Sequence, residues 1–482
     1  MNYELATLHK DLYIGGKWRP AADGGRFDVL DPGTEDVLAD VADATVEDGL
    51  DAVAAAHAAG PAWAATAPRE RAEILRRAYE LLIRHKEEFA RLMTMENGKV
   101  LAEARGEAVY AAEFLRWFAE EAVRIGGEIS IAPSGANRIM VLRQPIGVAV
   151  FVTPWNFPAA MATRKIGPAL AAGCTVVLKP AKETPLTALA MASLFEEAGV
   201  PPGVINVVPT RRSSAAVAAM LRDPRVRKLS FTGSTEVGRV LLAQAAENVV
   251  KCSMELGGNA PFIVFADADL DQAVASAMVA KMRNGGESCT AANRFYVERP
   301  VAAEFGRRFA AAMAQVRIGY GLDEGAQLGP LVNAATRNKV AELVADAQKH
   351  GAELLTGGKA RPGRGFYYEP TVLSGVAQDA RILREEIFGP VAPIAVFDSE
   401  EEVIALANDT VFGLVSFVHT RDLARAMRVA ERIESGMVGI NRGVVSDPAA
   451  PFGGWKQSGV GREGAHDGLL EYLESKYIAV SW

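Results

Sequence analysis

The sequence is poor in cysteine and has no long apolar run, and each absence excludes a class of protein. Its 482 residues include only Cys174, Cys252 and Cys289, too few for a disulfide framework and typical of a reducing compartment. No stretch of about 18 apolar residues predicts a transmembrane helix, and residues 1–16 lack the apolar core of a signal peptide. We therefore expect a cytoplasmic protein.

The charge pattern lacks any cluster of lysine and arginine. The formal net charge is −7 at pH 7, so we expect neither nucleic acid nor an anionic membrane as a partner. Apolar residues make up 49% and charged residues 23% of the chain, as in ordinary globular proteins. At about 150 residues per domain, the length predicts roughly three domains. We predict no metal site.

From residue 146 onward, short β-branched runs alternate with alanine-rich helical segments. The first series predicts strands at 146–152, 175–178, 204–208, 226–231 and 251–256, and the second at 261–265, 295–298, 391–397, 414–419 and 437–441. Such alternation, with near-continuous apolar strands, is typical of parallel sheets covered on both faces. The sequence therefore predicts two doubly wound α/β domains. Ligands are expected beyond the carboxyl ends of the strands of the first, with a cleft near residue 257.

The remaining segments have different patterns. Residues 12–41 predict a strand meander, and helical spacing predicts one helix over 69–95 and another over 102–124. Residues 130–142 and 470–482 predict strands that have no place in either sheet. Because unpaired strand edges commonly pair with another subunit, we expect a homo-oligomer, a dimer or a tetramer.

A loop of small polar residues carries the best candidate nucleophile. An apolar helical run ends at Gly285 and Gly286, and Cys289 follows in the sequence ESCTAANR. Glycines let the backbone approach a ligand closely, as a nucleophile requires. A free cysteine after a helix end is the alternative interpretation of this segment alone.

Seven short motifs together resemble the aldehyde dehydrogenase superfamily, and in this order and spacing they cover nearly the whole chain. They are TPWNFP (153–158), LKPAKETP (178–185), FTGSTEVG (231–238), MELGGNAP (254–261), ESCTAANR (287–294), EEIFGP (385–390) and APFGGWKQSGVGRE (450–463). The resemblance implies a Rossmann-like cofactor domain (1–125 and 145–256), a catalytic domain (257–456) and a small β oligomerisation arm (126–144 and 457–482). It also implies NAD(P)-dependent oxidation of an aldehyde through a cysteine thioester.

The resemblance assigns catalytic roles that the chemistry of each residue supports. Cys289 is the nucleophile, and it must be ionised to attack. Asn156 is an amide that donates to the oxyanion without titrating, as does the backbone N–H of Cys289. Glu255, at a strand end beside a glycine turn, is the base for thioester hydrolysis. Lys165 and Glu463 match a pair that relays protons behind the base. Without the motifs, each polar residue is also compatible with a turn, strand-end or surface role.

The usual G-x-G-x-x-G fingerprint of a dinucleotide site is absent after Val152. In the variant implied by the resemblance, Gly233 forms a tight turn and Ser234 opens a helix toward the pyrophosphate. Lys182 stands where relatives that prefer NAD carry Glu, so we expect NADP to be preferred, with NAD possible, and Arg211 and Arg212 add positive charge nearby. The cofactor-binding candidates are Thr153, Pro154, Trp155, Lys179, Ala181, Lys182, Arg211, Gly233, Ser234, Val237, Leu256, Gly257, Glu386 and Phe388.

Within the family the likeness is greatest to succinate-semialdehyde dehydrogenases. It implies an aldehyde substrate with a distal carboxylate, held by Arg164, Arg283 and the polar partner Ser446, since paired arginines fix such a carboxylate. Ala291 stands where some relatives have a second cysteine, so a redox-switch disulfide is excluded. The arginines would hold glutarate semialdehyde equally well. A cofactor-independent thiol esterase using Cys289 and Glu255, or a non-enzymatic binding protein, are the remaining alternatives.

Overall fold

The first sheet is built around parallel strands in the order β9-β8-β7-β10-β11. The computed structural model describes residues 3–481, and in it this sheet has eight strands in the order β2-β1-β9-β8-β7-β10-β11-β21. These strands are β1 (Leu12–Ile14), β2 (Lys17–Arg19), β7 (Val148–Val152), β8 (Thr175–Lys179), β9 (Ile205–Val207), β10 (Val226–Thr232), β11 (Lys251–Glu255) and β21 (Gly459–Val460). Every residue of β7 and β8 is buried, which explains their continuous apolar sequence.

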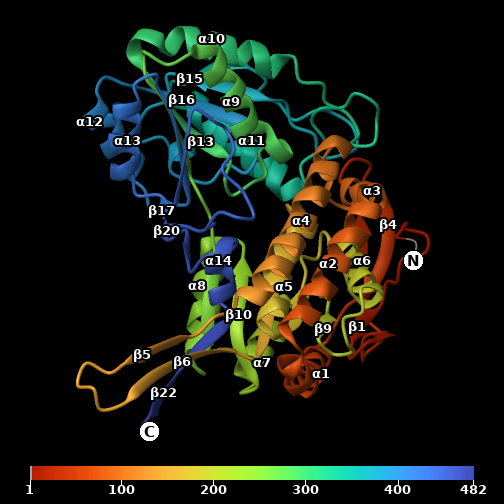
Figure 1. Ribbon diagram of the computed structural model, residues 1–482. Coiled ribbons are helices and arrows are strands. Elements are labelled where there is room, and N and C mark those ends of the chain that lie inside the picture. The colour runs from red at the N-terminus through yellow and green to blue at the C-terminus, as the bar shows by residue number, and fades with distance from the viewer. Residues whose placement is uncertain (1–2, 482) are drawn as a thin grey trace.

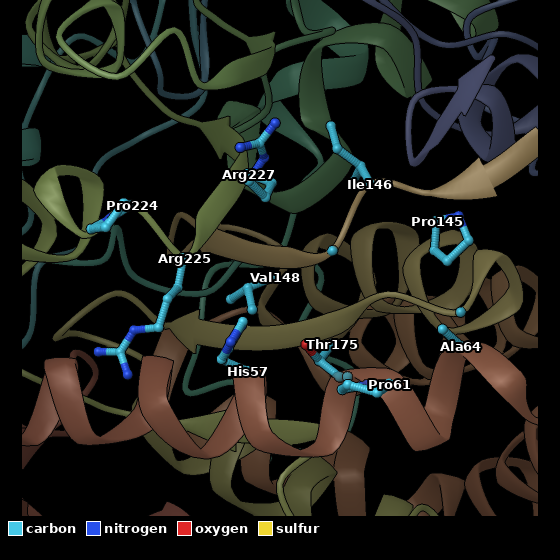
Figure 2. A pocket seen from close by; sticks show the side chains of 13 residues that line it. His57, Pro61, Ala64, Pro145, Ile146, Val148, Thr175, Pro224, Arg225 and Arg227 are labelled. Atoms are coloured by element: carbon cyan, nitrogen blue, oxygen red, sulfur yellow. The ribbon is translucent and has the colours of Figure 1, made fainter. Parts of the chain in front are cut away.

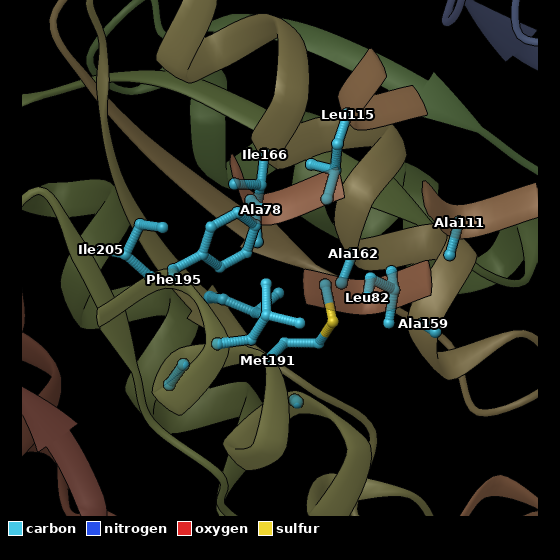
Figure 3. Packing of buried hydrophobic residues seen from close by; sticks show 14 of the residues in the cluster. Ala78, Leu82, Ala111, Leu115, Ala159, Ala162, Ile166, Met191, Phe195 and Ile205 are labelled. Atoms are coloured by element: carbon cyan, nitrogen blue, oxygen red, sulfur yellow. The ribbon is translucent and has the colours of Figure 1, made fainter. Parts of the chain in front are cut away.

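Alternate residues of these strands pack into two separate cores, one on each face of the sheet. Phe151 and Leu178 pack with helices α2 to α6, and Val150 and Val177 with α1, α7 and α8. Figure 3 shows the first of these cores, where alanines of α4 and α5 allow close helix packing around Met191 and Phe195. The helices are α1 (Val46–Ala65), α2 (Pro68–Arg84), α3 (Lys86–Asn97), α4 (Leu101–Glu121), α5 (Pro158–Ala172), α6 (Pro185–Glu197), α7 (Ser213–Arg222) and α8 (Thr235–Ala246).

The second sheet has seven strands in the order β14-β15-β16-β13-β12-β18-β19, all parallel except β14. Its strands are β12 (Ala260–Val264), β13 (Ala292–Glu298), β14 (Glu353–Thr356), β15 (Thr371–Ser374), β16 (Val391–Phe397), β18 (Val415–His419) and β19 (Met437–Ile440). Its helices are α9 (Leu270–Met282), α10 (Arg299–Ala314), α11 (Ala334–Lys349), α12 (Glu400–Asn408) and α13 (Leu423–Arg432). The predicted α/β class with two doubly wound sheets is confirmed.

A third, antiparallel sheet projects away from both α/β units (Figure 1). It consists of β5 (Glu128–Ile131), β6 (Arg138–Pro145) and β22 (Leu473–Val480), in the order β22-β6-β5. Ile129 is 72% exposed and Tyr477 is 59% exposed, so this arm carries apolar side chains that the described chain leaves uncovered. The expectation that these strands join neither large sheet is confirmed.

The segment before the last strand lies against the first sheet rather than in the arm. Its strand β21 pairs with β11, and helix α14 (Ala465–Leu470) packs on α4 and α5. The two-residue strands β17 (Phe412–Gly413) and β20 (Trp455–Lys456) pair with each other near the junction of the two units. The arm itself therefore contains less of the stretch after residue 456 than the sequence suggested.

Two local predictions are wrong, and two strands were not predicted. The single helix predicted over 69–95 is two helices, because His85 leaves the helical region (φ −100°, ψ 18°) and its ring packs edge-on against Tyr3. The predicted meander over 12–41 is divided: β1 and β2 extend the first sheet, while β3 (Arg26–Leu30) and β4 (Val37–Ala42) form a separate hairpin. Strands β14 and β15 had no counterpart in the predicted list.

Candidate active site

A cavity of about 260 Å³ lies where the carboxyl edge of the first sheet faces the amino edge of the second. In the first sheet the strand order reverses between β7 and β10, and ligands of open α/β sheets bind at such a reversal. The segments that follow β7, β10 and β11 meet the segments that precede β12, β13 and β16. The lining residues are Pro154, Trp155, Asn156, Phe157, Met161, Thr232, Gly233, Ser234, Leu256, Gly257, Cys289, Thr336, Lys339, Glu386 and Phe388.

Glycine turns shape the wall that the first sheet contributes. A Cβ on Gly233 would lie 2.4 Å from the Phe231 ring, and one on Gly238 would lie 2.5 Å from Leu256, so both positions require glycine. Ser234 caps helix α8 by accepting from the Val237 N–H, so the positive end of the helix dipole lies at this wall. The Thr232 hydroxyl is buried with no hydrogen-bond partner in residues 3–481. Such donors suit the phosphates and amide of a dinucleotide.

The opposite wall carries a carboxylate and an aromatic ring. Oε1 of Glu386 accepts from the Gly258 N–H at 3.1 Å, and burial raises the pKa of Glu386 to about 7. Phe388 packs edge-on against Trp155 in the cavity lining, with ring centroids 5.5 Å apart. The two rings offer an apolar surface to a planar ring, and Glu386 can accept from a ribose hydroxyl. The residues present therefore fit a nicotinamide dinucleotide.

The cysteine loop is held by an amide network. Asn284 has a left-handed backbone (φ +52°), and its Nδ2 donates to the carbonyl oxygens of Asn156, at 2.9 Å, and Glu287, at 3.1 Å. Nδ2 of Asn156 in turn donates to the Glu287 carbonyl at 3.0 Å. The second proton of that NH₂ group has no acceptor among the described residues, and Asn156 and Cys289 both line the cavity. The network ties the nucleophile to its candidate oxyanion donor.

The cysteine thiol itself is not activated by the protein alone. Cys289 is half-buried, and burial raises the pKa of its thiol to about 12, although the positive charge of Arg164 opposes the rise. The sequence analysis required Cys289 to be ionised for attack. The described residues, without cofactor, leave the thiol protonated at neutral pH.

The candidate base is a buried carboxylate at the end of β11. Glu255 is 2% exposed, and neither oxygen of its carboxyl group has a hydrogen-bond partner within the described chain. Burial and the neighbouring Glu463 raise the pKa of Glu255 well above its usual value, while Arg164 and Lys165 oppose them. A carboxylate in this state can accept a proton near neutral pH.

A buried ion cluster lies behind the base. Lys165 and Arg164 are neighbours on α5, and Glu463 lies between them: its Oε1 is 2.5 Å from the Lys165 Nζ and its Oε2 is 2.5 Å from the Arg164 Nε. Burial alone would raise the pKa of Glu463, but Lys165 and Arg164 hold it below its usual value. Lys165 also donates to the Ser230 hydroxyl at 3.0 Å.

A second, smaller cavity of about 20 Å³ lies on the other side of Cys289. It contains all three predicted substrate-binding residues, which come from three distant segments of the chain. Its lining is Tyr110, Phe157, Met161, Arg164, Arg283, Ser288, Cys289, Thr290, Ser446 and Phe452. The guanidinium of Arg283 lies over the rings of Tyr110, at 5.6 Å, and Phe157, at 5.0 Å. A thiol is thus flanked by a cofactor-sized cavity and a cationic one.

Comparison with known proteins identifies this arrangement. The family model described as the aldehyde dehydrogenase family matches residues 18–478. The chain belongs to the aldehyde dehydrogenase family. It is 55% identical to the succinate-semialdehyde dehydrogenase of Paenarthrobacter nicotinovorans over 92% of this chain and 99% of that protein. It is 50% identical to the glutarate-semialdehyde dehydrogenase of Pseudomonas aeruginosa over 99% of both chains.

A solved structure extends the comparison to the fold. The crystal structure of an NADP-dependent enzyme of Escherichia coli superposes with a TM-score of 0.97 at 49% identity, covering 98% of each chain. The expected aldehyde dehydrogenase fold is therefore confirmed. As members of this family, the chain and its relatives are NAD(P)-dependent oxidoreductases that act on aldehydes.

Six predicted cofactor residues of this aldehyde dehydrogenase do not line the larger cavity. They lie farther along the carboxyl edge of the first sheet or on the first turn of α8, and they are Thr153, Lys179, Ala181, Lys182, Arg211 and Val237. Lys179 is buried at the end of β8, where burial lowers its pKa to about 8, and its Nζ donates to Ser213. The backbone N–H of Thr153 donates to the Lys179 carbonyl, which keeps the two strand ends adjacent.

The three cations that the sequence placed near the 2′-phosphate of NADP, Lys182, Arg211 and Arg212, are partly neutralised by carboxylates. Nε of Arg211 lies 3.3 Å from Oδ2 of the buried Asp43, and Arg212 pairs with Asp23 at 2.7 Å. Lys182 is exposed, and its nearest carboxylate, that of Glu183, is 3.9 Å away. Of the three cations, Lys182 is therefore the one most available to a ligand.

Sequence reasoning missed several lining residues of both cavities. Phe157 and Met161 line both, and Thr336 and Lys339 come from the start of α11, which no motif marked. Tyr110 lines the small cavity, and its hydroxyl is buried without a hydrogen-bond partner in residues 3–481. Tyr110 lies in the helix predicted over residues 102–124, and its place there indicated only that it packs against other helices.

Other features of the molecule lie apart from this site. A cavity of about 480 Å³ opens at the amino ends of β7, β8 and β10, opposite the active site, between His57, Pro61, Arg225 and Arg227 (Figure 2). None of the predicted site residues lines it. Within residues 3–481, no helix is long and apolar enough to cross a bilayer, and no cluster of three or more His, Cys, Asp or Glu side chains could hold a metal.

Proposed function

We propose that this aldehyde dehydrogenase oxidises succinate semialdehyde to succinate and prefers NADP to NAD. The observation that carries the proposal is the small cavity, in which Arg164, Arg283 and Ser446 lie beside Cys289. An aldehyde whose carbonyl carbon reaches the thiol would direct a carboxylate a few carbons away toward the arginines, which match its charge and its planar geometry. The named relatives support the same substrate class.

The first chemical step joins the Cys289 sulfur to the aldehyde carbon. The thiolate supplies the electron pair, and the carbonyl π electrons move to oxygen, where the free N–H of Asn156 and the backbone N–H of Cys289 stabilise the negative charge. The hydride on this carbon leaves as the carbonyl re-forms, and NAD(P), held by the residues of the larger cavity, would supply its acceptor. The acyl group is then a thioester on Cys289.

Hydrolysis of the thioester requires a base. Glu255 takes a proton from water as the hydroxyl oxygen attacks the acyl carbon, and the C–S bond then breaks to release the carboxylate. In sum, aldehyde, water and NAD(P)⁺ give carboxylate, reduced cofactor and two protons. Glu463 and Lys165 lie behind the base, and they would pass the proton onward.

The preference for NADP is proposed on Lys182. Where a carboxylate would repel the 2′-phosphate, this exposed lysine attracts it, and a hydrogen bond to a charged group contributes about 1.5–3 kcal/mol, roughly 10- to 150-fold in affinity. Since Arg211 is neutralised by Asp43, it would contribute less than the sequence suggested. The resemblance to an NADP-dependent enzyme supports the direction of the preference.

Three further proposals concern the whole protein. The regions drawn from the sequence are the cofactor domain, the catalytic domain and the arm, and we assign residues 457–472 to the cofactor domain.

The projecting arm, with its exposed Ile129 and Tyr477, would pair with another copy in a dimer or tetramer. The low cysteine content supports a cytoplasmic location.

Glutarate semialdehyde is the second candidate substrate, because a close relative is a glutarate-semialdehyde dehydrogenase. Steady-state kcat/KM for succinate semialdehyde, glutarate semialdehyde and butanal, each with NADP and NAD, tests the proposal. The highest value for succinate semialdehyde with NADP supports it, and a value no higher than that of butanal rejects it. Activity without cofactor would instead indicate a thiol esterase.

A further inference from the structure

Arg164 belongs to two groups of residues at once. It lines the cavity beside Cys289, and its Nε lies 2.5 Å from Oε2 of Glu463, with only 1% of the side chain exposed. Arg283 lines the same cavity but has no carboxylate within salt-bridge distance in residues 3–481; its neighbours there are aromatic rings. The two arginines of the clamp are therefore not equivalent.

We infer, on the basis of the proposed function, that Arg164 serves the oxidation of every aldehyde through its positive charge beside Cys289 and, with Glu463, behind Glu255, whereas Arg283 serves mainly aldehydes with a distal carboxylate. Arg164 is in this sense a positioning residue as well as part of the clamp. The ring of Phe452, whose centroid is 4.1 Å from the Arg164 guanidinium carbon, packs against the guanidinium. This contact holds the guanidinium between the cavity and Glu463.

Charge balance in the buried cluster carries the inference. Arg164 and Lys165 bring two positive charges and Glu463 brings one negative charge, so the cluster has a net charge of +1 when Glu255 is protonated. Ionised Glu255 makes it neutral. Without Arg164, the same ionisation would leave the three buried groups Lys165, Glu463 and Glu255 with a net charge of −1, which is strongly disfavoured in the protein interior. Arg462, the other cation near Glu255, is only partly buried.

The charged groups around Glu255 and Cys289 support the role inferred for Arg164. Around Glu255 the charged neighbours are Glu463, Arg164, Lys165 and Arg462, and around Cys289 they are Arg164, Glu386, Glu255 and Arg283. Burial raises the pKa of both groups, and Arg164 opposes the rise at both. A substrate carboxylate bound to Arg164 would weaken that opposing field.

The test compares Arg164→Leu with Arg283→Leu, using butanal, which has no distal carboxylate. For Arg164→Leu we expect kcat/KM for butanal at pH 7 to fall at least tenfold more than for Arg283→Leu. The acid limb of the pH profile of kcat/KM should also move to higher pH in Arg164→Leu. A rise of one pKa unit lowers the ionised fraction about tenfold. Arg164→Lys, which keeps the charge, should return the limb toward the wild-type position, as a purely structural role would not require.

A second readout needs no cofactor. The rate of Cys289 alkylation by iodoacetamide follows the thiolate fraction, so at a fixed pH it should fall about tenfold in Arg164→Leu and less in Arg283→Leu. Cys289→Ala measures the background from Cys174 and Cys252. Equal alkylation rates in the two leucine variants, or equal losses with butanal, would overturn the inference.

The wild-type protein gives a test that does not depend on folding of a variant. The single-turnover rate of NADPH formation at saturating aldehyde should have its acid limb at higher pH for succinate semialdehyde than for butanal, because only the former engages Arg164. Coincident limbs would contradict the inference. If the wild type shows no preference for succinate semialdehyde, the substrate assignment fails, while the butanal and alkylation comparisons still decide the role of Arg164.

Discussion

The two cavities that meet at Cys289 differ in how they are built. The larger is formed mainly by backbone turns at strand ends, with glycines at 233 and 257 and few charged side chains. The smaller is formed by side chains from helices and loops far apart in sequence, including Arg164 and Arg283. The difference indicates that cofactor binding depends on the fold, whereas the choice of aldehyde depends on a few cations.

Loss of the nucleophile, which lines both cavities, should have the largest effect. Cys289→Ala removes the sulfur on which the thioester forms, so we expect turnover to fall by about four orders of magnitude or more. Binding of NADP, measured by fluorescence titration, should be retained because the rest of the larger cavity is unchanged. Turnover within tenfold of the wild type would contradict the role of Cys289.

Removal of the base Glu255 should separate thioester formation from thioester hydrolysis. In Glu255→Gln the thioester forms but hydrolyses slowly, so rapid mixing should show a burst of reduced cofactor followed by turnover reduced about 100- to 10,000-fold.

The pH profile checks the same residue. Because the pKa of Glu255 is raised, its carboxylate form is lost as pH falls through the raised pKa, so thioester hydrolysis slows and wild-type kcat should decline on the acid side. The limb assigned to Glu255 should be absent in Glu255→Gln. An unchanged steady-state rate or an unchanged limb would assign the base elsewhere.

Arg283→Leu tests whether the small cavity selects by charge. With one clamp arginine removed, kcat/KM for succinate semialdehyde should fall about 30- to 1000-fold, because a charged hydrogen-bonded pair with the substrate carboxylate is lost. The loss for butanal should be much smaller. Equal losses for both aldehydes would make Arg283 a support of the cysteine loop, to which it is adjacent in sequence.

Lys182 lies outside the larger cavity, and Lys182→Glu tests whether its charge controls the choice between NADP and NAD. The ratio of kcat/KM with NADP to that with NAD should fall about 10- to 150-fold. Lys182→Ala serves as the matched control and should give a smaller fall, since it removes attraction without adding repulsion. A ratio unchanged in both variants would remove Lys182 from the cofactor site.

Tyr110→Phe should have the smallest effect. It removes only the hydroxyl, which is buried beside the clamp without a partner among the described residues. If that hydroxyl donates to the substrate carboxylate, KM for succinate semialdehyde should rise about tenfold, while KM for butanal should rise less. An equal change for both aldehydes would assign Tyr110 to packing around Phe157.

Much of the fold follows from local sequence pattern. The apolar runs of β7 and β8 predict buried parallel strands because both of their faces are covered, and the strand ends locate the motifs. The helix break at His85 could not be predicted in this way, since the apolar spacing continues through it. The break coincides with packing against Tyr3, which is more than 80 positions away along the chain.

The sequence by itself determined the family, the candidate nucleophile and its base, because motif order and residue chemistry are local properties. Only the tertiary structure decided that the second sheet presents its amino edge to the site, that Asp43 neutralises Arg211, and that burial raises the pKa of Cys289. The reason is physical. Burial and ion pairing depend on which distant segments meet, as Lys165 and Glu463 do across 298 positions of the chain.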